Sequence, residues 1–411
     1  MKKLLSLVLA LCMLLSLTSF AVAEDTTITY STFSAAGAQE ETLKKMIAVF
    51  EEKNPGIKVD VRLTGYNDYF TKLATEIGGG NAPDVFEVNM ENFLAYMLRG
   101  ACADLSNLGI AKENYSEATL AAASSDGKLY AVPMSFSTCM LFYNKALFDK
   151  AGVDYPTDAW TWTDIQAAAE KIVAAGGEDT WGIFQPITYN EFYKAIASNG
   201  GSMLSADYKS FTVNTPENVA VLDAMLKRIR DTNVMPTTEE LAGRGDWDLF
   251  TEGKLGMIVT GIWGFQTFAE KCTFDWDVVV EPGYKDKSTF FFANVNCISP
   301  ESKKQEAAAK FIDAMGSDPD IVKLRLDASW ELPTIADQSK LSQYLEITPP
   351  ENREAVFNSM DYAVAPPALL EQGAVSEIIN NVLSTLETSE MTAQEALDEI
   401  QAQLTDADLL K

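Results

Sequence analysis

The first hundred residues alternate between strand-like and helix-like patterns, and this alternation restricts the folds that the chain can adopt. Residues 57–63, IKVDVRL, alternate apolar and polar side chains as a strand does, whereas residues 39–53 repeat apolar side chains at helical spacing. This order predicts an α/β fold with a mostly parallel sheet covered on both faces by helices. The predicted strands are residues 27–33, 57–63 and 84–89, and the predicted helices are residues 39–53, 66–77 and 91–99.

Three loops follow the predicted strands, at residues 33–37, 64–68 and 89–92. Ligands of open α/β sheets bind beyond the carboxyl ends of the strands, so these loops are candidate binding segments. Phe33 ends the first strand and either stacks on a ligand or caps the core. Tyr66 and Asp68, in the second loop, are candidates of the same kind.

Residues 130–145, YAVPMSFSTCMLFYNK, form an apolar, β-rich segment between a turn sequence and a helical pattern. The polar run Ser135-Phe136-Ser137-Thr138 interrupts it, and buried hydroxyl groups need hydrogen-bond partners. We interpret the segment as a strand that passes from one lobe to another, with the hydroxyl groups lining the gap between them. The alternative is an edge strand whose Ser and Thr side chains are solvated.

The N-terminus has the features of a secretory signal peptide over residues 1–23. Two lysines precede an apolar run over residues 4–17, and Ala-Val-Ala at 21–23 is a small-x-small cleavage site. Cys12 lies inside the apolar run, so lipid attachment there is not expected. The rest of the chain is long enough for two domains and contains no second long apolar stretch. We expect an exported soluble protein, in the periplasm or at the outer face of the cytoplasmic membrane.

The 411-residue chain has a formal net charge of −27 and no histidine. The acidic charge argues against nucleic acid and anionic membranes as partners. The lack of histidine removes histidine-assisted nucleophiles, histidine general bases and histidine-containing zinc sites. The cysteines after the signal peptide form no CxxC motif, so no metal or cofactor is expected. They are Cys102, Cys139, Cys272 and Cys297.

Seven segments after the signal peptide resemble, in order, segments of the family 1 extracellular solute-binding proteins. These proteins are the receptor subunits of bacterial carbohydrate ABC importers, and maltose-binding protein is a distant relative. The resemblance covers nearly all of the chain after residue 23. The segments are NPGIKV, GGNAPDVFEVN, LYAVP…LFYNKALF, TWTDIQAAAEKI, SNGGS, FTEGKLGMIVTGIW and ISPESKKQEAAAKFIDAM.

The resemblance implies a two-lobed periplasmic-binding-protein type II fold, with mixed sheets covered by helices and a hinge of crossing strands. Residues 290–298 resemble the return crossing, which would run beside residues 130–145 and bring Cys139 close to Cys297. A disulfide between them is one expectation, and four buried free thiols are the other. The implied lobes are residues 24–135 with 299–338, and residues 136–298 with 339–411.

A sugar site needs planar aromatic rings for the apolar faces of the sugar and polar groups for its hydroxyls. Trp263 follows a predicted buried strand, at a position where relatives stack a sugar on Trp; packing in the core is the alternative. Trp330 and Glu331 lie in the loop SWELPT, where relatives also present an aromatic side chain to the cleft. Core packing is expected instead for Trp162, Trp181, Trp247 and Trp276.

Glu91 and Asn92, beside Asn89, follow the third strand where relatives place groups that bind hydroxyls. Relatives often carry an Asp–Arg type pair here, and the departure to Glu-Asn leaves the identity of the sugar open. A solvated, acidic helix start is the alternative for these residues. Further positions on the cleft side by resemblance are Ser137, Tyr189 and Asn190.

The resemblance implies a monomeric receptor that captures an oligosaccharide between two closing lobes and docks on membrane permease subunits, without catalysing a reaction. A secreted glycoside hydrolase is the main alternative, but hydrolysis needs two carboxylates at a defined separation, and no motif nominates them. A receptor of the same fold for a solute other than a sugar is the second alternative.

Overall fold

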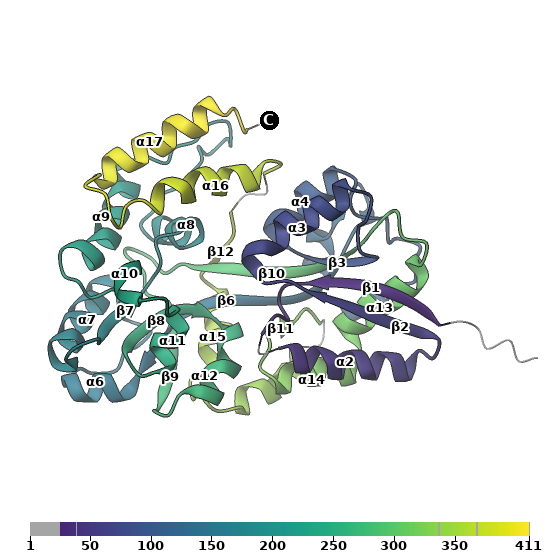
Figure 1. Ribbon diagram of the computed structural model, residues 1–411, viewed down its shortest axis with the longest axis horizontal. Coiled ribbons are helices and arrows are strands. Elements are labelled where there is room, and N and C mark those ends of the chain that lie inside the picture. The colour runs from purple at the N-terminus through teal and green to yellow at the C-terminus, as the bar shows by residue number, and fades with distance from the viewer. Residues whose placement is uncertain (1–24, 38, 336–337, 367–368, 411) are drawn as a thin grey trace, which may run out of the picture.

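A computed structural model describes residues 25–410 of the chain, apart from residues 38, 336–337 and 367–368. The predicted signal peptide lies outside these residues. Two lobes stand side by side, and two long strands run from one to the other (Figure 1). A continuous sheet passes through both lobes in the order β2-β1-β3-β10-β6-β8-β7. Within the described part of the chain, no helix has the length and apolarity needed to cross a bilayer.

The first lobe contains the strands and helices predicted from the alternating N-terminal pattern. Strand β1 pairs in parallel with β2 on one side and with β3 on the other. Helix α2 turns Leu43, Met46, Ile47 and Phe50 into the core, as their helical spacing predicts. The elements of this part are β1 (Thr26–Thr32), α2 (Glu40–Lys53), β2 (Ile57–Leu63), α3 (Tyr66–Gly78), β3 (Val85–Asn89), α4 (Met90–Leu98), α13 (Gln305–Ser317) and α14 (Pro319–Asp327).

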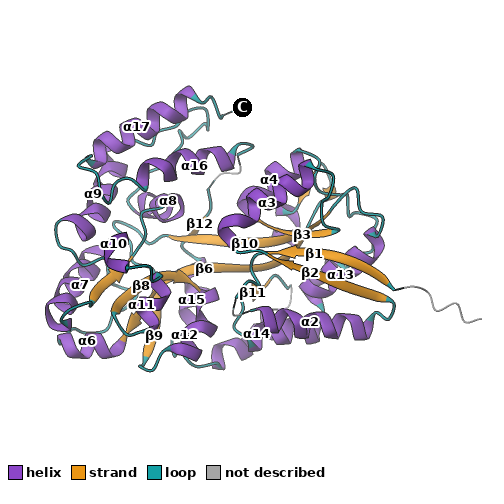
Figure 2. Cartoon of the chain, in the orientation of Figure 1, coloured by secondary structure: helices purple, strands orange, loops and turns teal. Residues whose placement is uncertain are grey.

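The strands β6 (Val132–Asn144) and β10 (Thr289–Ile298) connect the lobes (Figure 2). Residues 132–138 of β6 pair with β10, and residues 139–144 pair with β8 and β9 of the second lobe. β10 in turn pairs antiparallel with β3 of the first lobe. The segments predicted to cross between lobes therefore do so, and we call these two strands the crossing strands.

The second lobe is built around β8, which is buried along its whole length. The C-terminal helices α16 and α17 lie over α8 and α9 (Figure 1). Its main elements are α6 (Lys145–Ala151), α7 (Trp162–Gly176), β7 (Trp181–Phe184), α8 (Tyr189–Ser198), α9 (Pro216–Arg230), α10 (Thr238–Leu241), α11 (Asp246–Thr251), β8 (Leu255–Gly261), η2 (Ile262–Gly264), α12 (Phe265–Lys271), β9 (Trp276–Val280), α15 (Glu354–Met360), α16 (Gln372–Leu383) and α17 (Ala393–Asp406). The remaining elements of the described chain are η1 (Lys112–Asn114), α5 (Glu117–Ala122), β4 (Ser124–Ser125), β5 (Lys128–Leu129), β11 (Leu332–Pro333), η3 (Gln338–Glu346) and β12 (Ala363–Val364).

The predicted proximity of Cys139 and Cys297 is wrong. The crossing strands are antiparallel, with Phe291 opposite Thr138 and Asn296 opposite Val132, so the two cysteines lie at opposite ends of the paired segment. The sulfur of Cys297 instead lies 3.1 Å from that of Cys102, both as free thiols.

Candidate functional site

A cavity of about 830 Å³ opens between the two lobes, and both lobes and a crossing strand contribute to its wall. From the first lobe, the carboxyl ends of the three parallel strands and the loops that follow them face the cavity, as open α/β sheets generally arrange their sites. These residues are Phe33, Ser34, Ala36, Gly37, Gln39, Gly65, Tyr66 and Asn89. The opposite side is lined by Asn190, Trp247, Asp248, Thr251, Trp263, Thr267, Glu270 and Lys271.

The loop that carries Phe33 is held by a buried carboxylate on β3. The backbone N–H groups of Phe33 and Ser34 donate to Glu87 Oε2 at 3.3 Å, and the Ser34 hydroxyl donates at 3.0 Å. The hydroxyl of Thr32 donates to the same oxygen. Burial raises the pKa of Glu87 above its ordinary value. The phenyl ring of Phe33 also meets the Tyr66 ring edge to face at 5.4 Å, so two aromatic side chains form one wall.

Trp263 lies in the single turn η2, directly after the buried strand β8. Its indole folds back over Gly261, where an added Cβ would lie only 2.0 Å from the indole Cζ3 atom. It also meets the ring of Phe292 on β10, with centroids 5.3 Å apart. Trp247 packs against Phe268 at 5.2 Å and lines the same side of the cavity. The second lobe therefore presents two half-buried indoles to the cavity.

The floor of the cavity combines the crossing strand with one residue from a strained loop. Glu331 has a left-handed backbone with φ of +45°, which is uncommon for a residue with a side chain. Its carboxylate accepts hydrogen bonds from the Ser135 hydroxyl and, at 3.3 and 3.4 Å, from Asn294 Nδ2. Burial raises the pKa of Glu331. Phe292, Asn294 and Glu331 complete the cavity wall.

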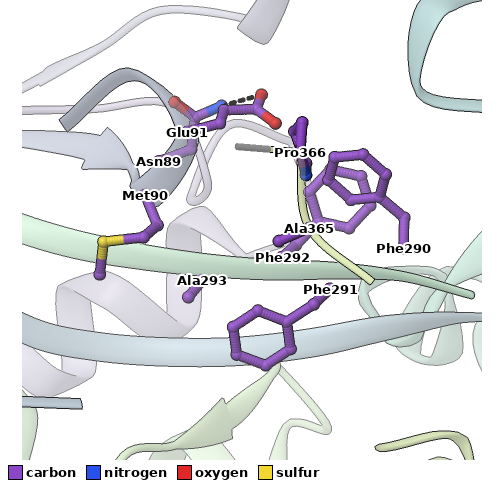
Figure 3. Close-up of a pocket in the computed structure, with 9 residues that line it drawn as sticks. All are labelled: Asn89, Met90, Glu91, Phe290, Phe291, Phe292, Ala293, Ala365 and Pro366. Atoms are coloured by element: carbon purple, nitrogen blue, oxygen red, sulfur yellow. Dashed lines mark hydrogen bonds between the residues drawn. The ribbon is translucent and has the colours of Figure 1, made fainter. Parts of the chain in front are cut away.

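A smaller pocket of about 90 Å³ adjoins the main cavity and shares Asn89 and Phe292 with it (Figure 3). Asn89 Nδ2 donates to Glu91 Oε1 at 2.6 Å, shown as the dashed line in Figure 3. Burial raises the pKa of Glu91 to about 7. The other residues of this pocket are Met90, Phe290, Phe291, Ala293, Ala365 and Pro366.

The structure brings half of the candidate residues from the sequence together in the wall of the main cavity. They are Phe33, Tyr66, Asn89, Asn190, Trp263 and Glu331. Glu91 lines the adjoining pocket. Asn92 Nδ2 donates a hydrogen bond to Asn89 Oδ1 at 2.7 Å and so helps to hold the Asn89 side chain in place. Whether these side chains contact a ligand remains a prediction.

The other candidates lie outside both pockets. Asp68 is exposed on α3, and Ser137 is buried in β6. Tyr189 is buried, and its hydroxyl accepts from Gln372 Nε2 at 2.9 Å. Trp330 is 2% exposed and packs in the core of the first lobe, where the Arg325 guanidinium lies 4.4 Å from the ring centroid. The expectation that an aromatic side chain of this loop faces the cavity is therefore wrong, because Glu331 takes that place.

The expectation that the hydroxyl run of β6 lines the gap is also wrong. Ser135, Ser137 and Thr138 are each at most 1% exposed, and the neighbouring strand β10 supplies the crossing-strand residues of the wall.

Trp162, Trp181 and Trp276 lie in the core as expected, whereas Trp247 also lines the cavity. The sequence signal for this placement is the position of Trp247 beside Asp248, at the start of a short helix that follows a Gly-Arg-Gly loop.

The chain matches the family model described as "Bacterial extracellular solute-binding protein" over residues 33–320, well over half its length. It belongs to this family. The solute-binding protein is 42% identical to an ABC substrate-binding protein from Listeria monocytogenes in complex with cycloalternan, whose structure it matches with a TM-score of 0.89. That match covers 94% of this chain and 100% of the other.

Two further relatives are more distant. The arabinooligosaccharide-binding protein of Bacillus subtilis is 24% identical to the solute-binding protein, over 98% of this chain and 99% of the relative. The structure of a maltose-bound protein from T. maritima matches with a TM-score of 0.80 at 20% identity, covering 93% of this chain and 100% of that one. This last likeness concerns the fold alone, and it agrees with the two-lobed arrangement described above.

Proposed function

We propose that this solute-binding protein is the receptor of an ABC importer and captures an oligosaccharide in the cavity between its lobes. The observation that carries the proposal is the composition of the cavity wall, in which aromatic rings from both lobes face the same space. Phe33 and Tyr66 stand on the first lobe, and Trp247 and Trp263 on the second. Sugar rings have apolar C–H faces, and planar aromatic side chains are suited to cover them.

Polar groups between these rings suit the hydroxyls of a sugar. Asp248 and Glu270 can accept hydrogen bonds, Lys271 can donate them, and Asn190 and Asn294 can do both. Hydrogen bonds to charged groups contribute about 1.5–3 kcal/mol each. Micromolar affinity requires about 8 kcal/mol in total, so a few such bonds with one or two stacked rings suffice.

Closure of the lobes follows from the same arrangement. A ligand that touches both lobes gains all its contacts only when the lobes are closed, so binding shifts the protein toward the closed form. The lobes that move are residues 24–135 with 299–338, and residues 136–298 with 339–411. The closed monomer then docks on the permease subunits, after export directed by residues 1–23.

Two of the relatives support an oligosaccharide as the ligand. The 42% identical neighbour was solved with cycloalternan, and the B. subtilis relative is named for arabinooligosaccharides. The cavity of about 830 Å³ falls in the upper part of the range of small-molecule sites. Cycloalternan is therefore the first probe, and linear oligosaccharides are the second.

Isothermal titration calorimetry and thermal shift against a panel of sugars test this proposal. The panel holds cycloalternan, linear maltooligosaccharides, arabinooligosaccharides, galactooligosaccharides and their monosaccharides. We expect at least one oligosaccharide to bind with micromolar or tighter affinity and to raise the melting temperature, with its monosaccharide at least tenfold weaker. No shift with any sugar would contradict the carbohydrate assignment and would favour a solute of another class.

Product analysis separates the receptor from a hydrolase. The protein is incubated for a day with each oligosaccharide that binds, and the mixture is analysed for shorter sugars. A receptor leaves every sugar intact. Shorter products that accumulate with time and protein concentration, and that a cavity variant such as Trp263→Ala no longer forms, would show that the cleft is catalytic.

A further inference from the structure

Cys102 and Cys297 lie against each other in the core of the first lobe. Their sulfur atoms are 3.1 Å apart, and the side chains are 5% and 0% exposed. The next residues along each segment are joined by a backbone hydrogen bond, from Ala103 N to Ile298 O at 2.8 Å. Cys297 itself stands in β10, opposite Phe86 of β3. The hydrogen bond next to the cysteines therefore keeps the two segments together, and the pairing with β3 fixes the position of Cys297.

We propose that Cys102 and Cys297 form an intramolecular disulfide in this protein. A disulfide has a sulfur–sulfur bond of about 2.05 Å, so the two sulfurs need to approach by about 1 Å. Disulfides persist in oxidising compartments outside the cytoplasm, where the proposed signal peptide directs this chain. The proposal concerns a property other than ligand capture. It rests on one part of the proposed function only, the export of the chain.

Formation of the bond needs an oxidant. A disulfide in the compartment outside the cytoplasm, carried by a small molecule or by another protein, serves as that oxidant. The thiolate of one cysteine attacks the oxidant disulfide and forms a mixed disulfide, with release of one thiol. The second cysteine then attacks the sulfur of the first, and a second thiol leaves. Two protein thiols become one disulfide, and one disulfide of the oxidant becomes two thiols. Atoms and electrons therefore balance.

The bond forms during folding, before the core closes. In the folded chain both sulfurs are buried, and burial raises the pKa of the Cys297 thiol well above its ordinary value. The reactive thiolate is therefore scarce once folding is complete. The same burial shields the finished disulfide from reductants. The bond joins the segment after α4 to the crossing strand β10, positions 195 residues apart.

Refolding of the reduced chain from residue 24 onward tests the proposal. The chain is refolded from denaturant in a mixture of reduced and oxidised glutathione, then denatured again and alkylated with iodoacetamide. We expect two alkylated cysteines without a reductant and four after reduction, and a Cys102–Cys297 peptide in the digest. Four alkylated cysteines without a reductant, or a link that involves Cys139 or Cys272, would overturn the proposal.

Melting temperatures with and without a reductant give a second readout. Loss of a bond that closes so long a loop lowers the melting temperature of the wild type by about 5–15 °C. The Cys139→Ser variant is the matched control, because it removes another buried thiol and keeps the proposed bond. It shows the same dependence on reductant, whereas Cys297→Ser shows none. The proposal would be contradicted if wild-type protein, unfolded and refolded with a reductant, had the same melting temperature as protein treated without one.

Discussion

The indole of Trp263 meets the phenyl ring of Phe292 edge to face, with ring centroids 5.3 Å apart and ring planes inclined at 83°. Trp263 belongs to the second lobe, and Phe292 to a strand that crosses between the lobes. Both line the cavity. Such a contact stabilises the orientation of the indole, so less side-chain freedom is lost when a ligand stacks on it.

Replacement of Trp263 by Ala weakens binding much more than folding. The half-buried indole lies at the cavity wall, so its removal deletes a stacking surface without leaving a closed void in the core. We expect affinity for the oligosaccharide to fall at least tenfold and the melting temperature to change by only a few degrees. Calorimetry and thermal melts of the same preparation measure both effects.

Trp276→Ala is the matched control for that variant. Trp276 is 3% exposed and lies in the core of the second lobe, so its truncation costs about 3–5 kcal/mol of folding free energy. A Trp263 variant that loses as much stability as the Trp276 variant would mark the Trp263 indole as a core side chain.

Gly261→Ala displaces the Trp263 ring without touching Trp263 itself. The new Cβ would lie 2.0 Å from the indole Cζ3 atom, closer than any van der Waals contact, so the ring must move. We expect altered Trp fluorescence and a loss of affinity close to that of Trp263→Ala. Gly78→Ala is the control, because an added Cβ there meets no atom within 4 Å. Unchanged affinity in Gly261→Ala would argue against a role for the present orientation of the indole.

Lys194→Met destabilises the second lobe strongly. The Lys194 ammonium is fully buried and contacts Glu191 at 2.6 Å and Glu281 at 2.8 Å, which ties α8 to the end of β9. Loss of one partner leaves buried carboxylates uncompensated and costs about 3–5 kcal/mol. Denaturant unfolding measures the loss, and Lys194→Met with Glu281→Gln should recover part of it. A loss below 1 kcal/mol would show that water reaches the cluster.

Glu91 makes folding stability depend on pH. Burial raises its pKa to about 7 from 4.5, so between these values the unfolded chain loses the proton while the folded chain keeps it. Its contribution to stability is therefore complete below pH 4.5 and is lost as the pH rises to 7. We expect wild type to lose about 1–3 kcal/mol relative to Glu91→Gln over this interval, since one pKa unit corresponds to about 1.4 kcal/mol. Parallel pH profiles of the two proteins would mean that Glu91 titrates normally.

Local patterns predicted much of the first lobe and its side of the cavity. The strands β1, β2 and β3 of that lobe lie within one residue of the predicted ranges, because helices and strands there follow strong hydrophobic periodicity. The carboxyl ends of parallel strands share one edge of a sheet, so the sequence predicts that Phe33, Tyr66 and Asn89 lie near one another, and all three line the cavity. The position of Trp263 came from the resemblance to the family.

What the sequence did not predict depends on backbone geometry over a few residues. Ser329 and Glu331 have left-handed backbone conformations, and in this loop Glu331 lines the cavity while Trp330 packs in the core. The spacing of apolar residues in the sequence does not show which of the two side chains faces the cavity. The antiparallel pairing of the crossing strands decided the cysteine contacts, because their register separates Cys139 from Cys297. Strand direction and register depend on the tertiary fold rather than on local pattern.

A crystal structure of the protein with the sugar that binds most tightly tests the central claim most directly. The account predicts one oligosaccharide between the lobes, with a sugar ring on Trp263, another contact to Phe33 or Tyr66, and hydrogen bonds from both lobes. A sugar bound to one lobe alone, or at a surface away from the cavity, would contradict it.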